Sequence, residues 1–193
     1  DLHARIRTLK SSAILTLAAC GHVVRNTTDC QAPMPGRARS ELVDWAQRAH
    51  MVFKPRTRAY YGIWMDGERV VTAEAPEPGE PGTPDEEPLY GRVYLPRKFK
   101  IGFAAPGDNC TDVLINDCAV IPLVDDDHIR AFTICIGGGM GKTHAKPETY
   151  PRLATPLTTV PPDELIATIE AVVKLHRDHG NRENREHARL KYV

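Results

Sequence analysis

Residues 118–136 read CAVIPLVDDDHIRAFTICI, which is two apolar, β-rich runs on either side of three aspartates. Runs rich in Val, Ile and Thr are typical of β-strands, and a short polar turn between two of them is typical of a hairpin. The sequence therefore predicts strands at about 118–124 and 129–136, with Asp125–Asp127 as the turn. The second strand runs into the glycine cluster of AFTICIGGGMGKTH, residues 131–144. Glycines there favour a backbone that closely approaches a ligand, or a nest of amides that faces an anion.

Helices are predicted before and after this hairpin in the chain. Over residues 40–51 apolar side chains recur on one helical face, and Ser40 is a suitable N-cap. A second helix is predicted over 161–179, because proline is tolerated in a first helical turn and Gly180 is a natural stop. A short third helix is expected over 182–191. The buried stripe of the second helix is expected to be Leu165, Ile166, Ile169, Val172 and Val173.

Further strands complete a mixed architecture. Two β-rich runs in AYYGIWMDGERVVTA, residues 59–73, flank Asp66-Gly67, a pair that fits a tight hairpin turn. Extended segments are also predicted at about 15–24 and 97–104. Helices that pack on such a sheet give an α+β fold class, a mixed α/β module. Six acids and five prolines in EAPEPGEPGTPDEEP, residues 74–88, predict an exposed acidic loop without a regular element.

The charge of the chain is balanced overall and uneven along its length. The 193 residues hold 25 Lys and Arg and 25 Asp and Glu, and six of those acids lie in residues 74–88. The remaining chain is moderately basic and suits an anionic ligand, with ordinary surface charge as the alternative. Basic residues are not interleaved with aromatic ones, so no nucleic-acid partner is expected. The longest apolar run, Ile14 to Cys20, is too short to span a bilayer, so no membrane partner is expected either.

The cysteines indicate neither a disulfide framework nor a metal site. Their number is odd and no CxxC pair occurs, which favours a reducing compartment, the cytoplasm or a plastid. Cluster and metal ligands usually come in close pairs, so no metal ligand is predicted in this chain. The five are Cys20, Cys30, Cys110, Cys118 and Cys135.

Basic side chains recur in YLPRKFK, residues 94–100. On an extended chain Lys98 and Lys100 share one face, while Arg97 takes the other. Two ammonium groups about 6–7 Å apart repel each other by roughly 2–3 kcal/mol, and a bound anion removes that cost. The alternative is that both lysines extend into solvent from an edge strand.

Two other arginine positions suit an anion. Arg25 follows an apolar segment in CGHVVRN, where a guanidinium is able to fork onto a carboxylate or an oxyanion. Arg182, Arg185 and Arg189 share one face of the predicted third helix, which suits a polyanion; a solvated face balanced by neighbouring glutamates is the alternative.

In their order along the chain, these motifs resemble the siroheme-containing sulfite and nitrite reductases. The resemblance covers essentially the whole length and implies modules that surround one siroheme bridged to a [4Fe–4S] cluster. Residues 1–17 resemble the end of a ferredoxin-like half-domain, and residues 18–193 the first cofactor-binding module. The cluster-binding module is expected to lie downstream, so we expect the chain to be a fragment. The matching segments are LTLAACGHVVRN, AYYGIW, EPLYGRVYLPRKFKIGF, GGGMGKTH, ETYPRLA and RDHGNRENREHARLKY.

The resemblance also implies roles for individual residues. Arg25, Lys98 and Lys100 match the basic groups that hold the substrate oxyanion over the iron, as catalytic and cofactor-binding residues. Arg97 and Arg189 match contacts to the siroheme carboxylates. Siroheme and sulfite are both anionic, so binding them in one place needs concentrated positive charge, and lysine ammonium groups are able to supply protons. None of the five cysteines matches a cluster ligand of the family, so the chain alone is expected to be inactive.

The resemblance favours one substrate and one electron donor. Lys100 stands where sulfite reductases typically have lysine and nitrite reductases asparagine, which predicts six-electron reduction of sulfite to sulfide. GGGMGKTH looks more like the ferredoxin-dependent branch than the NADPH-flavoprotein branch, which predicts ferredoxin as the donor. The remaining modules of the same polypeptide are the other expected partners. His22 and Val24 depart from the family's Asp and Asn. Two alternatives stay open: nitrite reduction to ammonia, and a non-catalytic module that holds oxyanions or an anionic tetrapyrrole.

Overall fold

The computed structural model describes side chains and backbone at residues 22–25, 27–30, 35–56, 87–91 and 93–193, and the backbone of 62–65 and 68–72. Several predictions lie outside these described residues: the half-domain over 1–17, most of the segment over 15–24, the turn at Asp66-Gly67 and the acidic loop up to residue 86.

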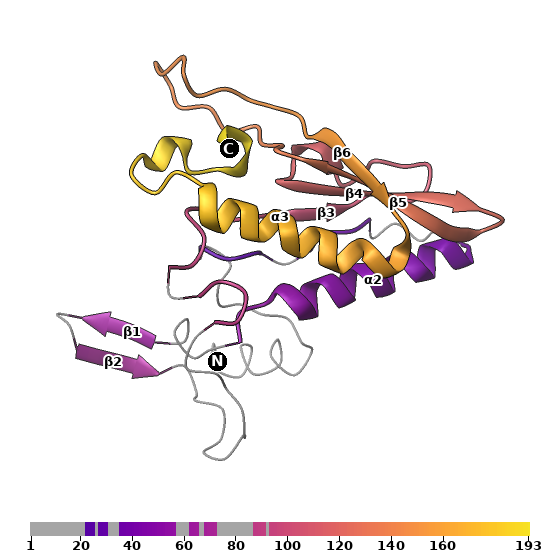
Figure 1. Ribbon diagram of the computed structural model, residues 1–193, viewed down its shortest axis with the longest axis horizontal. Coiled ribbons are helices and arrows are strands. Elements are labelled where there is room, and N and C mark those ends of the chain that lie inside the picture. The colour runs from indigo at the N-terminus through magenta and orange to yellow at the C-terminus, as the bar shows by residue number, and fades with distance from the viewer. Residues whose placement is uncertain are drawn as a thin grey trace, which may run out of the picture.

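A four-stranded mixed sheet forms the centre of the molecule (Figure 1). Its first two strands are parallel and the others antiparallel, and the strands follow one another in chain order. The predicted α+β class is confirmed. The strands are β3 (Ile101–Phe103), β4 (Cys118–Asp125), β5 (His128–Ile136) and β6 (Thr155–Val160). A separate antiparallel hairpin is made by β1 (Gly62–Met65) and β2 (Glu68–Thr72).

The hairpin of β4 and β5 agrees with the prediction. Asp126 and Asp127 both take the left-handed conformation, with φ of 48° and 54°. A two-residue turn of this kind matches the twist of the strands that it joins, and aspartate tolerates it better than most residues do. Asp125 itself belongs to β4.

Helices α2 (Arg37–Phe53) and α3 (Leu165–His179) cover one face of the sheet (Figure 1). Alternate strand residues point to this face, so Val120 and Ile134 join the large core while Ala119 and Cys135 join a small cluster on the other face. The helices contribute Ala38, Leu42, Ala46, Ala49, Phe53, Leu165, Ile169, Val172 and Val173 to the large core.

Helix α2 begins one turn before the predicted N-cap. Gly36 precedes it and has no side chain to cap it, and the carboxylate of Asp127 does so from the hairpin turn. Asp127 accepts hydrogen bonds from the amides of Arg37 at 2.6 Å and Ala38 at 3.2 Å. A cap supplied by another element leaves no local signal, which explains why Ser40 was the wrong prediction.

The end of α3 agrees with the prediction, and its buried stripe differs by one residue. The helix ends at Gly180, whose backbone is extended, and a Cβ at this position would clash with the carbonyl oxygen of His176 and the ring of Pro96. His176 is fully buried, whereas Ile166 is only partly so.

The predicted third helix over 182–191 is wrong. Two 3-10 turns, η4 (Arg185–His187) and η5 (Leu190–Tyr192), take its place. The side chain of Asn181 accepts hydrogen bonds from the amides of residues 183 and 184, and that of Asn184 accepts one from residue 186. Asparagine side chains that bond nearby amides compete with helix formation.

Two strand predictions also need correction. The strand expected at 97–104 is shorter, since only Ile101–Phe103 forms β3 and Phe99 makes an isolated bridge. Strand β6 was not predicted. It lies at the sheet edge and contains Pro156, a residue that edge strands tolerate.

Candidate functional site

The segment that contains Arg25 lies beside the segment that contains the two lysines. Val24 pairs with Phe99 in a parallel bridge, and the amide of Arg25 donates to the carbonyl of Phe99 at 2.8 Å. Val24 and Phe99 are both buried. Side chains alternate along paired segments, so Arg25, Lys98 and Lys100 take the opposite, partly exposed face. The structure therefore brings these three predicted site residues together.

The cations in this cluster repel one another. Burial lowers the pKa of Lys98, and repulsion by Arg25, Arg97, Lys100 and Arg189 lowers it further. Desolvation and like charges both disfavour the charged form of an amine. The Nε of Arg25 is buried and has no hydrogen-bond partner in the described part of the chain. A buried donor of this kind is costly unless a ligand satisfies it.

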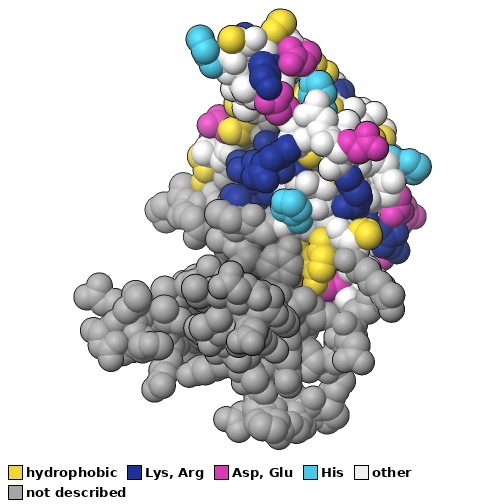
Figure 2. Space-filling view, turned by 90° about the vertical axis from the view of Figure 1, so that its left-hand side faces the viewer, with side chains coloured by type: hydrophobic (Ala, Val, Ile, Leu, Met, Phe, Trp, Pro, Cys, Tyr) yellow, Lys and Arg dark blue, Asp and Glu magenta, His cyan; other side chains and the backbone are white. Residues whose placement is uncertain are grey.

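A pocket of about 410 Å³ opens next to this cluster. Six of its lining residues are basic and one, Glu186, is acidic; that glutamate is paired with Lys146 at 2.6 Å. Figure 2, which looks at the side of the molecule where the C-terminal turns lie, shows Lys and Arg side chains gathered on that face. We call this pocket the basic pocket; it is lined by Arg97, Lys98, Gly141, Lys142, Thr143, Thr149, Arg185, Glu186, Arg189, Lys191 and Tyr192.

Arg189 reaches the basic pocket from an ion pair with a buried carboxylate. Its Nε and Nη2 donate to Asp117 at distances of 2.9 to 3.0 Å. Burial raises the pKa of Asp117, and the charge and hydrogen bonds of Arg189 oppose that rise. Sequence reasoning missed Asp117, because its partner Arg189 lies 72 residues further along the chain.

The three tail arginines do not form the predicted stripe. Arg185 and Arg189 line the basic pocket, but Arg182 does not. Its guanidinium donates instead to the carbonyls of Val93, Tyr94 and Arg177. Without a continuous helix, the spacing of these residues no longer places them on one face.

The glycine-containing segment borders the basic pocket through Gly141, Lys142 and Thr143. It is held by Lys191, which sequence reasoning also missed. The Nζ of Lys191 donates to the carbonyls of Gly139, Gly141 and Tyr150, and the side chain is buried. Burial and the charge of Arg189 lower the pKa of Lys191. The ammonium group is used to hold the loop, so we expect it to act on a ligand through loop position more than by direct contact.

The described cysteines do not form an iron–sulfur site. Cys118 and Cys135 are buried, and burial raises the pKa of both thiols, which disfavours the thiolate that a metal binds. Cys30 and Cys110 form one disulfide, although no disulfide framework was expected from the sequence. Asp108 lies beside that pair, and among the described residues this is the one group with metal-ligand spacing.

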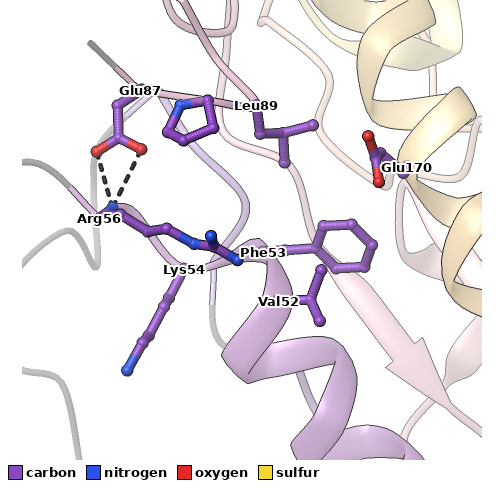
Figure 3. A pocket seen from close by; sticks show the side chains of 8 residues that line it. Val52, Phe53, Lys54, Arg56, Glu87, Leu89 and Glu170 are labelled. Carbon is purple, nitrogen blue, oxygen red and sulfur yellow. Dashed lines mark hydrogen bonds between the residues drawn. The ribbon is translucent and has the colours of Figure 1, made fainter. Parts of the chain in front are cut away.

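A second, smaller pocket of about 120 Å³ lies between the end of α2 and α3 (Figure 3). The carboxylate of Glu87 is buried there and accepts hydrogen bonds from the amide of Arg56 at 2.8 and 3.1 Å. Glu87 was predicted to be part of an exposed loop, and this end of the loop is instead anchored to α2. In the described part of the chain, no helix is long and apolar enough to cross a bilayer.

An α+β module that gathers cations around one pocket is suited to an anionic ligand. The chain belongs to the family described as "Nitrite and sulphite reductase 4Fe-4S domain", which matches residues 44–193. The resemblance to sulfite and nitrite reductases is thereby confirmed. The family's description and the word hemoprotein in its relatives' name agree with siroheme and a [4Fe–4S] cluster as the cofactors of the family.

Relatives match this chain along its whole length. The sulfite reductase [NADPH] hemoprotein beta-component of Myxococcus xanthus is 42% identical over 193 residues, which is 100% of this chain and 32% of that protein. The protein of the same name from Bacillus subtilis is 42% identical over 195 residues, with the same coverage. The chain thus spans about a third of the length of these relatives. The solved structure of Mycobacterium tuberculosis NirA has the same fold, with a TM-score of 0.60 and 23% identity over 96% of this chain and 27% of that one.

The prediction of a ferredoxin-type enzyme is wrong. The relatives from Myxococcus xanthus, Geobacillus kaustophilus and Bacillus subtilis are all named for NADPH. That prediction depended on GGGMGKTH. In the structure Gly141, Lys142 and Thr143 of this segment line the basic pocket, and a buried lysine holds the loop.

Proposed function

We propose that this chain supplies the siroheme-binding and oxyanion-binding surface of a sulfite reductase that makes sulfide in a six-electron reduction. One observation carries the proposal: the buried, unpartnered Nε of Arg25 lies in a cluster with Lys98 and Lys100. A bound anion offsets the repulsion and the desolvation of such a cluster. In this proposal Arg25, Lys98 and Lys100 hold the oxyanion.

The residues present fit siroheme and do not fit the cluster. Arg97 and Arg189 line a pocket dominated by basic side chains, and we assign the siroheme carboxylates to them. Siroheme, when bound, supplies the electron transfer to the substrate. No set of thiolates among the described cysteines suits a [4Fe–4S] cluster, so its ligands are assigned to another module of the same polypeptide.

The lysines are suited to deliver protons as well as to bind. Repulsion and burial lower the pKa of Lys98, so its ammonium group is a stronger acid than an ordinary lysine. A group whose pKa is nearer the working pH transfers a proton more readily. The oxyanion itself opposes the shift while it is bound, which keeps Lys98 charged until the anion accepts the proton.

Sulfite is the proposed substrate, and an NADPH-dependent component is the proposed partner. The names of the relatives support both assignments, since each is called the hemoprotein beta-component of an NADPH sulfite reductase. Lys100 adds a third cation to the cluster, which favours a dianion over the singly charged nitrite. The division into residues 1–17 and 18–193 and a cytoplasmic location stay predictions.

The test is substitution in the complete enzyme that contains this chain. Lys98→Gln and Lys100→Gln are expected to raise the KM for sulfite by about tenfold or more, because each removes a charge-assisted hydrogen bond. Lys100→Asn is expected to lower the preference for sulfite over nitrite, measured as the ratio of the two kcat/KM values. The control is Lys174→Gln, an exposed lysine of α3 that pairs with Glu170. Wild-type sulfite kinetics in the Lys98 and Lys100 variants would refute the proposal.

A further inference from the structure

Asp117 is a buried carboxylate to which the proposed function gives no role. It is 0% exposed and directly precedes β4. Its oxygens accept three hydrogen bonds from Arg189, and Oδ2 also accepts the amide of Lys100 at 2.9 Å. A carboxylate this deeply buried is costly unless it is fully paired, and here each oxygen has at least two donors.

The two partners of Asp117 belong to different parts of the basic cluster. Lys100 belongs to the segment proposed to hold the oxyanion, and Arg189 to the tail proposed to hold siroheme. Asp117 uses the Nε and Nη2 of Arg189, while Nη1 makes no hydrogen bond within the described chain. A two-point fork fixes the plane of a guanidinium, so it also fixes the direction in which Nη1 points.

The glycine cluster is docked on the same short segment. The amide of Gly137 donates to the carbonyl of Asp117 at 2.9 Å, and that of Gly138 to the carbonyl of Asn116 at 3.1 Å. The oxyanion segment, the siroheme tail and the glycine-containing segment therefore all meet at residues 116–117. A change in the Asp117 carboxylate therefore acts both on Lys100, which is proposed to hold the oxyanion, and on Arg189, which is proposed to hold siroheme.

We propose that Asp117 is a positioning residue that sets Lys100 and Arg189 in the geometry with which they bind the oxyanion and siroheme. The proposal rests on the proposed function of those two residues. Asp117 itself lies behind them and touches neither ligand. The negative charge of Asp117 also offsets the positive charge of Arg189, which reduces the repulsion among the cations of the cluster.

The test is Asp117→Asn in the complete, siroheme-loaded enzyme. An amide has one acceptor oxygen and presents donors on its other side, so Lys100 or Arg189 must lose its partner. Sulfite binding, followed by the change in the siroheme absorption spectrum, is expected to weaken about tenfold, the scale on which outer-shell partners act. Hydrogen exchange at the Lys100 amide is expected to become faster.

Asp125→Asn is the matched control, since Asp125 lies at the far end of the same strand and pairs with Arg130. Thermal unfolding of each loaded variant separates positioning from stability. A purely structural Asp117 would lower the unfolding temperature and leave the sulfite affinity of the folded, loaded enzyme at the wild-type value. That result would overturn the proposal.

A second variant covers the case in which Asp117→Asn does not fold. Asp117→Asn with Arg189→Gln removes both buried charges, which is far less costly than leaving one unpaired. Arg189 is itself assigned to siroheme, so the deciding measurement in this double variant is hydrogen exchange at the Lys100 amide, which bonds Asp117 directly. Wild-type exchange at that amide would overturn the proposal. If Lys98→Gln and Lys100→Gln leave sulfite kinetics unchanged, the proposed function fails; if they act while Asp117→Asn matches Asp125→Asn, only the role of Asp117 fails.

Discussion

Gly138 shows how one residue lets the glycine-containing segment pack against the backbone of residues 114–116. A Cβ at this position would overlap the carbonyl oxygens of Leu114 and Asn116, which are backbone atoms that cannot move aside. Gly138→Ala is therefore expected to destabilise the fold by about 1–3 kcal/mol, the range for overpacking a tight site. Urea unfolding measures this. Gly141→Ala is the matched control, because a Cβ at Gly141 would meet no atom within 4 Å. Equal midpoints for the two variants would contradict the packing argument.

From the sequence alone, residues that would face a ligand are more easily identified than the residues that hold them in place. Arg25, Lys98 and Lys100 were identifiable because they match a family motif and are basic. Asp117 and Lys191 were not, since nothing in the sequence indicates that a carboxylate next to β4 pairs with a tail arginine. Their roles depend on contacts between positions far apart in the chain, and only the folded structure shows which partners they meet.

At the scale of elements, the hairpin turn caps helix α2. Asp127 accepts hydrogen bonds from the first amides of α2, and Asp126 precedes it with the same left-handed backbone. Asp127→Gly keeps a residue that tolerates positive φ and removes the cap, so the urea midpoint at neutral pH is expected to fall. Asp126→Gly is the control, since no hydrogen bond from α2 reaches Asp126 in the described structure. A similar loss in both variants would assign the effect to the turn.

The same cap gives a pH dependence with a definite sign. Hydrogen bonds from the amides of Arg37 and Ala38 hold the pKa of Asp127 below its ordinary value of 3.8. The folded state therefore binds the proton less tightly than the unfolded state does. The cap's contribution to the free energy of unfolding is therefore fully present above pH 3.8. It is lost as the pH falls through the lower pKa that Asp127 has in the folded state. The stability difference between wild type and Asp127→Gly is expected to shrink in that acidic range; a constant difference in urea titrations would contradict it.

Elements with local signals were predictable and elements with distant causes were not. The β4–β5 hairpin and α3 were found from periodicity and turn residues. The start of α2 was misplaced because its cap comes from the hairpin turn, and the tail was taken for a helix because its asparagines were not recognised as competing acceptors. Edge strand β6 was missed because its proline indicates a loop when the neighbouring strand is unknown.

At the scale of the whole molecule, the site depends on one chain segment that joins the sheet from a distance. Val23, Arg25 and Thr28 are joined to the segment Phe99–Phe103 by backbone hydrogen bonds that include Thr28 to Ile101 at 3.0 Å and Phe103 to Thr28 at 2.8 Å. This contact brings Arg25 to the lysines. Cys30 lies just beyond the paired residues, and its bond to Cys110 ties the segment to the loop that follows β3.

The Cys30–Cys110 bond closes a loop with a sequence separation of 80 residues. Such a link reduces the freedom of the unfolded chain, and Cys110→Ser is expected to lower the free energy of unfolding by about 2–4 kcal/mol under non-reducing conditions. With dithiothreitol the bond is absent from both proteins, so their urea midpoints are expected to agree closely. Titration of free thiols in unfolded protein supplies the independent check, because the bond removes two thiols from wild type. A Cys110→Ser effect of the same size with and without reductant would mean that the side chain acts by packing alone, and that the segment with Arg25 is held to the sheet by its backbone hydrogen bonds only.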